Sequence, residues 1–191
     1  GGTNRLTVHA NPVVTGNVVG GGTSDTLDLG GSTNGTFNVS FIGPATQFRG
    51  FEAFEKTGTS TWTLNGTTTE TTPWTIKGGT LSISTDGALG DGTVTIDGGT
   101  LAITADTTVD NGVSLGASNG TISIGTGIAA TLSGSTAGSG NLTKAGAGTL
   151  TLSNAVSFSG STAVSEGRLI SSGSFARPVS IASGAVFEFQ G

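Results

Sequence analysis

The chain has 191 residues, of which 35 are Gly and none is Cys, and its net charge is −5 with only seven basic residues. So few Lys and Arg exclude a nucleic-acid-binding protein, because that polyanion needs a basic stripe. No apolar run reaches the roughly 18 residues of a membrane-spanning helix. Without Cys there are no disulfides and no thiolate metal ligands. The chain starts at Gly1 without Met or signal peptide, so we expect a segment excised from a longer exported protein.

Residues 1–55 are the least regular part of the sequence. Short strands are expected at 6–8, 26–29 and 36–42, and the segment 47–56 is expected to form a longer coil or a small excursion. Five Phe residues are concentrated here, and they are interpreted as core or cap rather than as a binding patch.

A phrase close to Gly-Gly-Thr-Leu recurs further along the chain, each time followed by alternating small polar and aliphatic residues. The copies lie at 78–84, 98–104, 119–125 and 147–153. Alternation puts the aliphatic residues on one face of each strand and Thr or Ser on the other. No single strand can bury its aliphatic face alone, so the repeat predicts coils that stack. The predicted fold is all-β, a right-handed parallel β-helix of about nine coils.

An antiparallel β-sandwich is the alternative, because Asn-Gly and Asp-Gly pairs between strands are also strong hairpin signals. A sandwich gives no reason for the steps of 20 and 21 residues between the first three phrases. It also does not explain a longer register, in which KTGTSTWTL at 56–64 matches KAGAGTLTL at 144–152. Two copies of a four-coil block explain both. We therefore expect one β-helical segment, 1–191, with irregular coils at 1–55 and regular repeats at 56–191.

The residues at 140–169 resemble the autotransporter-associated β-strand repeat, also called the passenger-associated transport repeat. The pattern is Leu-Thr-Lys-x-Gly-x-Gly-Thr-Leu-x-Leu followed by Gly-Thr-x-Val-x-x-Gly-x-Leu, with Ser161 in the place of the Gly that opens the closing motif. The segment 51–66, followed by 74–84, looks like a divergent copy with Ser60 for the second Gly and Trp62 for Leu.

This resemblance implies a bacterial type V secretion passenger, at the cell surface as an outer-membrane-anchored or secreted protein. Its partner would be its own C-terminal β-barrel, which is absent here because the chain ends shortly after Phe189. We expect a monomeric structural stalk that aids secretion, folding and surface display. The alternative is an adhesin rod that binds host glycans or matrix protein, or that self-associates. A polysaccharide-active enzyme is a third hypothesis.

Two groups of residues were weighed as sites of chemistry. Ser118 lies in a Gly-x-Ser-x-Gly match, but the single His9 is upstream, so the match is interpreted as chance. Five Asp residues lie between 86 and 110, and a coil of about 20 residues would stack Asp86 with Asp106 and Asp91 with Asp110. Such pairs suit solvated corners, a weak Ca²⁺ site or a catalytic pair.

No catalytic, cofactor-binding or metal-binding residue is assigned from the sequence, and no enzyme activity is expected. A lyase would lack its base, because there is no Lys or Arg between Lys77 and Lys144. The two Trp residues were considered as glycan-stacking aromatics. The repeat alignment places Trp62 inside, in the position of Leu150, whereas Trp74 aligns with Thr162 and is interpreted as core or as exposed on the rod.

Overall fold

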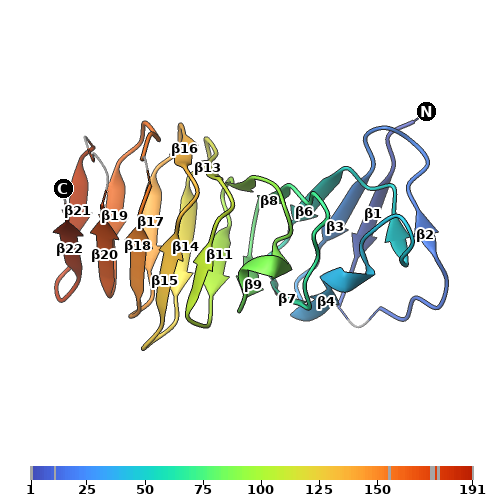
Figure 1. Cartoon of the computed structure of the whole chain (residues 1–191), viewed down its shortest axis with the longest axis horizontal. Helices are drawn as coiled ribbons and strands as arrows, with labels where there is room; N and C mark the ends of the chain where they lie inside the picture. Colours follow the sequence, from blue (N-terminus) through green and yellow to red (C-terminus); the bar gives the residue numbers. More distant parts are fainter. Residues whose placement is uncertain (1, 11, 155, 173–174, 176, 191) are drawn as a thin grey trace.

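The computed structural model describes residues 2–10, 12–154, 156–172, 175 and 177–190. These residues form a parallel β-solenoid of about 9 turns with almost no helix (Figure 1). Every strand pairing among them is parallel, which confirms the predicted β-helix and excludes the antiparallel sandwich.

Three sheets make up the wall of the solenoid, and we call them faces one, two and three. Face one contains β1 (Arg5–Val8), β3 (Thr26–Leu29), β6 (Ala53–Lys56), β8 (Trp74–Ile76), β10 (Val94–Ile96), β13 (Val113–Leu115) and β16 (Thr136–Gly138). Face two contains β4 (Gly35–Asn38), β7 (Thr61–Asn65), β9 (Thr80–Ile83), β11 (Thr100–Ile103), β14 (Gly120–Ile124), β17 (Leu142–Ala145), β19 (Thr162–Val164) and β21 (Val179–Ile181). Face three contains β12 (Thr107–Val109), β15 (Ala129–Leu132), β18 (Thr149–Leu152), β20 (Arg168–Ser171) and β22 (Val186–Phe189).

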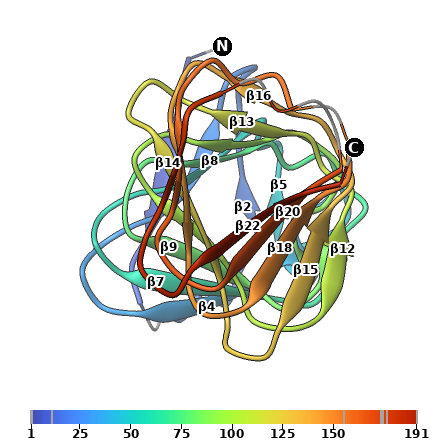
Figure 2. The ribbon, with the colours of Figure 1, turned by 90° about the vertical axis from the view of Figure 1, so that its left-hand side faces the viewer.

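The handedness is visible from the C-terminal end. In Figure 2 the chain passes counter-clockwise from face one to face two to face three while it advances toward the viewer, which is a right-handed coil. The remaining elements are short: β2 (Val18–Val19) pairs with β5 (Phe48–Arg49) at the N-terminal end, and two 3-10 turns cover Val39–Phe41 and Asp86–Ala88.

Stacking follows the repeat that the sequence predicted. On face two Thr80 pairs with Thr100 and Thr100 with Thr121, so one coil takes 20 and then 21 residues. In each of these strands the aliphatic residue after Thr is fully buried, whereas Thr points outward and is half-buried. The predicted alternation is therefore confirmed, and it builds one continuous core of Leu, Ile and Val.

The fourth copy of the phrase lies on a different face from the other three. The first three copies contain β9, β11 and β14 of face two, but the copy at 147–153 contains β18 of face three. On face two β14 instead pairs with β17, the segment Leu142–Ala145. The corners before these four strands each have a residue with positive φ, namely Gly79, Gly98, Asn119 and Gly146. An inward aliphatic residue follows each of them, so the same phrase can serve either corner. The step of 28 residues reflects this change of face.

The same change of face corrects the expectation that the chain consists of two copies of a four-coil block. Lys56 ends β6 of face one, whereas its counterpart Lys144 lies in β17 of face two. The two copies of the longer repeat are thus not superimposed along the rod. The second copy is placed one face further around it.

Both Trp side chains are in the core, with no solvent exposure. The indole N–H of Trp62 donates to the carbonyl of Gly30 at 3.0 Å, and its ring reaches Gly35, where a Cβ would lie only 2.9 Å from ring atoms. Trp74 packs on Phe54 with ring centroids 5.4 Å apart. Of the two interpretations of Trp74, the core position is confirmed and the exposed glycan-stacking position is wrong. Thr162, with which it aligns, is also buried, so the two aligned positions are both inward.

The N-terminal Phe residues divide between core and surface. Phe37, Phe48 and Phe54 are buried, and the rings of Phe37 and Phe48 lie 5.2 Å apart. Phe51 packs against the core from the rim, whereas Phe41 remains 47% exposed at the end of the rod. The interpretation as core or cap is correct for the buried three.

Candidate functional site: the lysine corners

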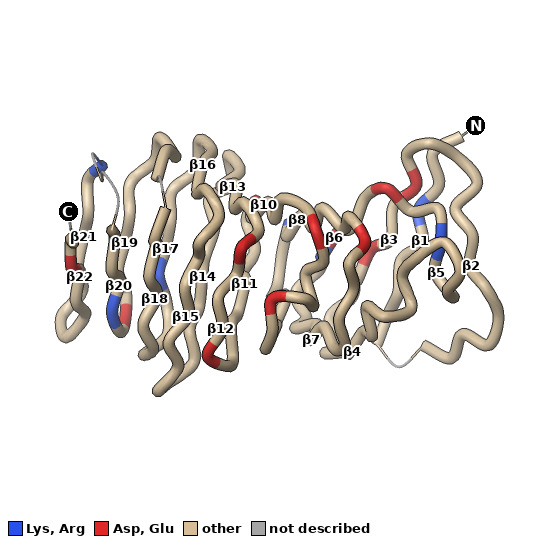
Figure 3. The backbone as a smooth tube through the Cα atoms, viewed as in Figure 1, with Lys and Arg blue, Asp and Glu red and all other residues tan. Residues whose placement is uncertain are grey.

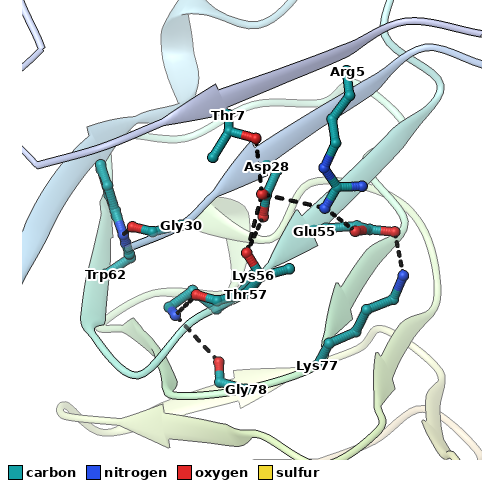
Figure 4. A network of polar contacts seen from close by, with 10 residues as sticks. All are labelled: Arg5, Thr7, Asp28, Gly30, Glu55, Lys56, Thr57, Trp62, Lys77 and Gly78. Carbon is teal, nitrogen blue, oxygen red and sulfur yellow. Dashed lines mark hydrogen bonds and ion pairs between the residues drawn. The ribbon is translucent and has the colours of Figure 1, made fainter. Parts of the chain in front are cut away.

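Lys56 is buried at the corner between faces one and two. In β6 the side chains of Phe54 and Lys56 point inward, and Lys56 has no solvent exposure although it carries an ammonium group. Its Nζ donates to the carbonyl of Thr57 at 2.5 Å, in its own corner, and to that of Gly78 at 3.2 Å, in the corner of the next coil. Figure 4 shows the ammonium between these two carbonyls. One side chain thus connects two successive coils.

Lys144 repeats the arrangement 88 residues later, at the corner between faces two and three. It is also fully buried, and its Nζ donates to the carbonyls of Ala145 at 2.9 Å, Gly146 at 2.7 Å and Glu166 at 3.1 Å. Ala145 and Glu166 are the counterparts of Thr57 and Gly78 in the first copy. We call this arrangement the lysine clasp: a buried Lys whose ammonium joins its own corner to the corner of the next coil.

Glycines make the clasp possible because the backbone must turn its carbonyls inward. Gly58 and Gly146, two residues after each Lys, have φ of 69° and 73°, and Gly79 and Gly167 in the next coil have φ of 60° and 63°. Only Gly adopts this region without steric cost. At Gly79 a Cβ would also lie 2.8 Å from the Nζ of Lys56. The Gly positions of the repeat are therefore those that shape the carbonyl cage.

Burial changes the acid–base behaviour of both lysines. Removal of the ammonium from water lowers the pKa of Lys144 to about 8, against the opposing charge of Glu166. Burial likewise lowers the pKa of Lys56, opposed by the charge of Asp28. Protonated Lys brings three N–H donors to the cage, so the charged form suits a set of carbonyl acceptors. At neutral pH, below its pKa of about 8, Lys144 therefore forms its clasp as an ammonium group.

A pH dependence of stability follows from the Lys144 pKa. The folded pKa of about 8 lies below the unfolded value of about 10.4, so between these pH values the unfolded chain binds more protons. Stability therefore rises with pH through this window and is independent of Lys144 below it. We expect urea titrations at pH 7.5 and 10 to show a gain of about 2 kcal/mol in the free energy of unfolding. The gain should shrink in Lys144→Met, and an equal gain in that variant would contradict the assignment.

An ion-pair network covers the outer side of face one near the first clasp. Arg5 contacts Glu55 at 2.5 Å and Asp28 at 3.2 Å, and Lys77 contacts Glu55 at 2.5 Å (Figure 4). Partial burial raises the pKa of Glu55, but the hydrogen bonds from Lys77 and Arg5 outweigh it and leave that pKa below its usual value. Thr57 also donates to Asp28 at 2.8 Å. The network links four coils from outside, as the clasp links two from inside.

Asp and Asn side chains form a second type of connection between coils. Each accepts a hydrogen bond from a backbone N–H one coil later. The acceptor and donor pairs are Asn34 with Thr61 (2.8 Å), Asp86 with Asp110 (3.1 Å), Asp97 with Ser118 (2.8 Å), Asp106 with Ala129 (2.8 Å), Asn119 with Asn141 (3.0 Å) and Asn141 with Ser161 (2.8 Å). Corner N–H groups of one coil are thus satisfied by the coil before it.

The Asp residues between 86 and 110 stack differently from the sequence prediction. Asp86 meets the backbone of Asp110 and not Asp106, and burial followed by the charges of Asp110 and Asp91 raises the pKa of Asp86. Asp106 bonds instead to Ala129. Within the part of the chain that the structure describes, no three of His, Cys, Asp and Glu come together in a way that could hold a metal ion.

Ser118 and His9 are not brought together. Ser118 lies on the corner between β13 and β14, where its N–H donates to Asp97, whereas His9 follows β1 in the first coil. Figure 1 shows these elements well apart along the rod. The residues of the Gly-x-Ser-x-Gly match serve as an ordinary corner.

The lysine corners are also the part of the chain that comparison with known families identifies. The sequence profile of one family, described as the passenger-associated transport repeat, matches residues 54–83 and 142–170. The chain carries two passenger-associated transport repeats. Each match begins within two residues of its clasp Lys and contains the corner of the following coil, so one passenger-associated transport repeat contains one complete clasp.

The repeats and the β-solenoid together fit a segment of an autotransporter passenger, a class of protein found at the cell surface or secreted. No curated protein and no solved structure matches the chain. Among the described residues, no helix is long and apolar enough to cross a membrane.

The two repeats differ at one Gly, and the structure explains why. A Cβ at Gly148 would lie 2.2 Å from the carbonyl oxygen of Gly125 in the coil below. The first repeat has Ser60 at this place, buried, with its Oγ lacking a hydrogen-bond partner among the described residues. Its N–H still reaches the carbonyl of Gly31 at 3.2 Å, so the corner of that copy accommodates a side chain.

We expect Gly148→Ala to destabilise the protein by about 2 kcal/mol, because a well-packed backbone must move to admit the methyl group. Ser60→Ala, the matched change in the first repeat, removes an unpaired hydroxyl and is expected to be neutral or slightly stabilising. Thermal unfolding of both variants by circular dichroism measures the difference. Equal losses in the two variants would show that the Gly148 contact is not the cause.

Proposed function

We propose that residues 1–191 act as one structural stalk segment of a type V secreted autotransporter passenger. The observation that carries the proposal is the lysine clasp. Both repeats place a buried Lys so that its ammonium bonds to its own coil and to the next. The clasp is complete only when the second coil has docked, so each repeat couples the folding of two neighbours. In a solenoid, stability is the sum of such nearest-neighbour terms.

In this proposal the partner of the segment is the C-terminal translocator of the same protein, and the segment lies on the bacterial surface or is released from it. Folding of clasped coils outside the membrane would oppose return of the chain and would hold the functional region of the passenger away from the cell. The low charge of the rod supports a passive role: residues 78–143 contain no Lys or Arg, and Figure 3 shows Asp and Glu scattered along it.

The adhesin hypothesis loses its strongest support because Trp74 is in the core. No specific observation in the described residues favours a glycan-binding or enzymatic role over the stalk. A binding screen of the isolated segment against glycans and matrix proteins separates the adhesin from the stalk, since the stalk proposal predicts no specific binding.

The test of the stalk proposal is secretion of the complete passenger from its native host with both clasps removed. Lys56→Met with Lys144→Met is expected to reduce the surface-exposed passenger several-fold, measured by protease shaving of intact cells. The matched control is Lys77→Met, which removes a lysine that is exposed and lies outside the clasps. Unchanged surface display of the double variant, or an equal loss in the control, would refute the proposal.

A further inference from the structure

A short motif near the N-terminus is repeated one coil later. Thr15-Gly16-Asn17-Val18 is followed by Thr36-Phe37-Asn38-Val39, 21 residues further on. The neighbouring strands β1 and β3 are paired at the same step, Arg5 with Thr26. In β4 and β7 the Thr-x-Asn motif stacks in register, Thr36 on Thr63 and Asn38 on Asn65. The sequence therefore assigns residues 14–17 to face two of the first coil, directly before β4.

The structure places residues 14–17 away from that position. Among the described strands β4 is the last of face two, with β7 on one side and no strand on the other. The Nε2 of Gln47 donates to the carbonyl of Val14 at 2.7 Å and to that of Gly16 at 3.1 Å, which holds the segment outward. A cavity of about 330 Å³ lies between this segment and β4. Pro12 and Val14 line it on the side of the segment, and Thr36, Phe37, Asn38 and Phe41 line it on the other side.

Exposed apolar surface at this end favours closure of the cavity. Val13 is 89% exposed and Val14 is 37% exposed. None of the residues that line the cavity is charged, so a strand would enter it without burying a charge. An uncovered edge strand also presents unpaired N–H and C=O groups, which are a template for another strand.

We propose that the outer edge of β4 is a strand-docking site whose occupant is residues 14–17 of the same chain. In the docked arrangement Thr15 pairs with Thr36 and Asn17 with Asn38. The Thr and Asn of residues 14–17 then extend the rows of stacked Thr and Asn side chains on face two. In the closed arrangement Val18 follows Asn17 toward Val39 and leaves β5, so the hydrogen bond from its N–H to the carbonyl of Gln47 (2.8 Å) is released as well. The N-terminal end therefore has an open arrangement with a free edge and a closed arrangement without one, and Gln47 selects the open one.

Cysteine cross-linking tests the register, and the natural chain has no Cys to interfere. Facing residues of paired strands lie about 4.8 Å apart, within the range that a disulfide spans. In Thr15→Cys with Thr36→Cys the two thiols face each other when the segment docks. In the control, Asn17→Cys with Thr36→Cys, the two thiols are offset by two residues along the strands when the segment docks. Their Cα atoms are then too far apart for a disulfide. We expect the first pair to oxidise within one chain at least about ten times faster than the control.

Gln47→Ala supplies the second arm, because it removes the two hydrogen bonds that hold the segment outward. It is expected to speed oxidation of the in-register pair by up to about tenfold and to slow hydrogen exchange of the amides of residues 35–38. Equal oxidation rates of the two pairs, or no effect of Gln47→Ala on either measurement, would overturn the proposal. Disulfides formed mainly between chains would also overturn it, since the occupant of the edge would then be a second copy.

Discussion

Replacement of Leu150 by Asp is expected to destabilise the solenoid by about 4–5 kcal/mol. Leu150 has no solvent exposure and is stacked between Ala130 of β15 and Leu169 of β20. The change places a carboxylate in the core and removes apolar contacts to two coils. Because each coil of a solenoid is stabilised by its contacts with the adjacent coils, the loss of stability should extend to the neighbouring coils. Chemical unfolding followed by circular dichroism measures the size of the effect.

The matched control is Thr151→Asp, one residue further along the same strand. Thr151 points outward, half-buried, between Thr131 and Ile170. A carboxylate there stays in water, so the expected loss is below about 1 kcal/mol and reflects strand preference alone. Equal destabilisation by the two substitutions, or a Leu150→Asp protein with native resistance to proteolysis, would contradict the assignment of Leu150 to a continuous core.

Lys144→Met is expected to cost about 2–4 kcal/mol although Met fills a similar volume and carries no charge. Replacement of a buried charge by an apolar residue can be neutral when its partners are removed with it. Here the partners are the backbone carbonyls of Ala145, Gly146 and Glu166, and they remain buried after the change. Unsatisfied buried acceptors cost about 1–3 kcal/mol, so the substitution is expected to lower the free energy of unfolding. Urea unfolding at pH 7 measures the loss.

Lys77→Met is the control for the general effect of losing a lysine. Lys77 is exposed and contacts Glu55, which keeps Arg5 as a second partner. Exposed ion pairs contribute about 0–1 kcal/mol, so the expected loss is small. A Lys144→Met variant as stable as Lys77→Met would show that the ammonium does not hold the corner.

The general plan of the fold was predictable because it depends on local signals. Alternation of Leu81 and Ile83 with small polar residues identified the inward face, and the spacing of the Gly-rich phrases gave the length of a coil. Which face a strand occupies was not predictable. A Gly corner followed by Thr-Leu suits any corner of the rod, so the phrase at 147–153 carries no mark of face three.

The clasp was present in the sequence as a matching pair, Lys56 and Lys144, and its role was missed. The available signal was the alternation of inward and outward residues along a strand. Lys56 lies two residues after the inward Phe54, and Lys144 lies two residues after the inward Leu142. A lysine at such a position must find buried acceptors. The carbonyls that it finds belong partly to the next coil, about 22 residues away, and sequence reasoning could not place them without the stacking register.

For Trp74 and the Asp residues the sequence left surface chemistry and structural roles open, and the structure gives them structural roles. Trp74 fills the core beside Phe54, and both side chains are fully buried. Asp97 and Asp106 accept N–H groups of the next coil, a contact that depends on the path of the corner and not on residue spacing alone.

The most direct test of the central claim, that each repeat joins two successive coils through its Lys, is hydrogen exchange of the wild-type chain and of Lys144→Met. The account predicts faster exchange in two segments far apart in sequence, 145–148 and 165–168, with residues 56–80 unchanged. Faster exchange in 145–148 alone would show that Lys144 supports only its own corner, and a uniform increase along the chain would show a global loss of stability without a clasp.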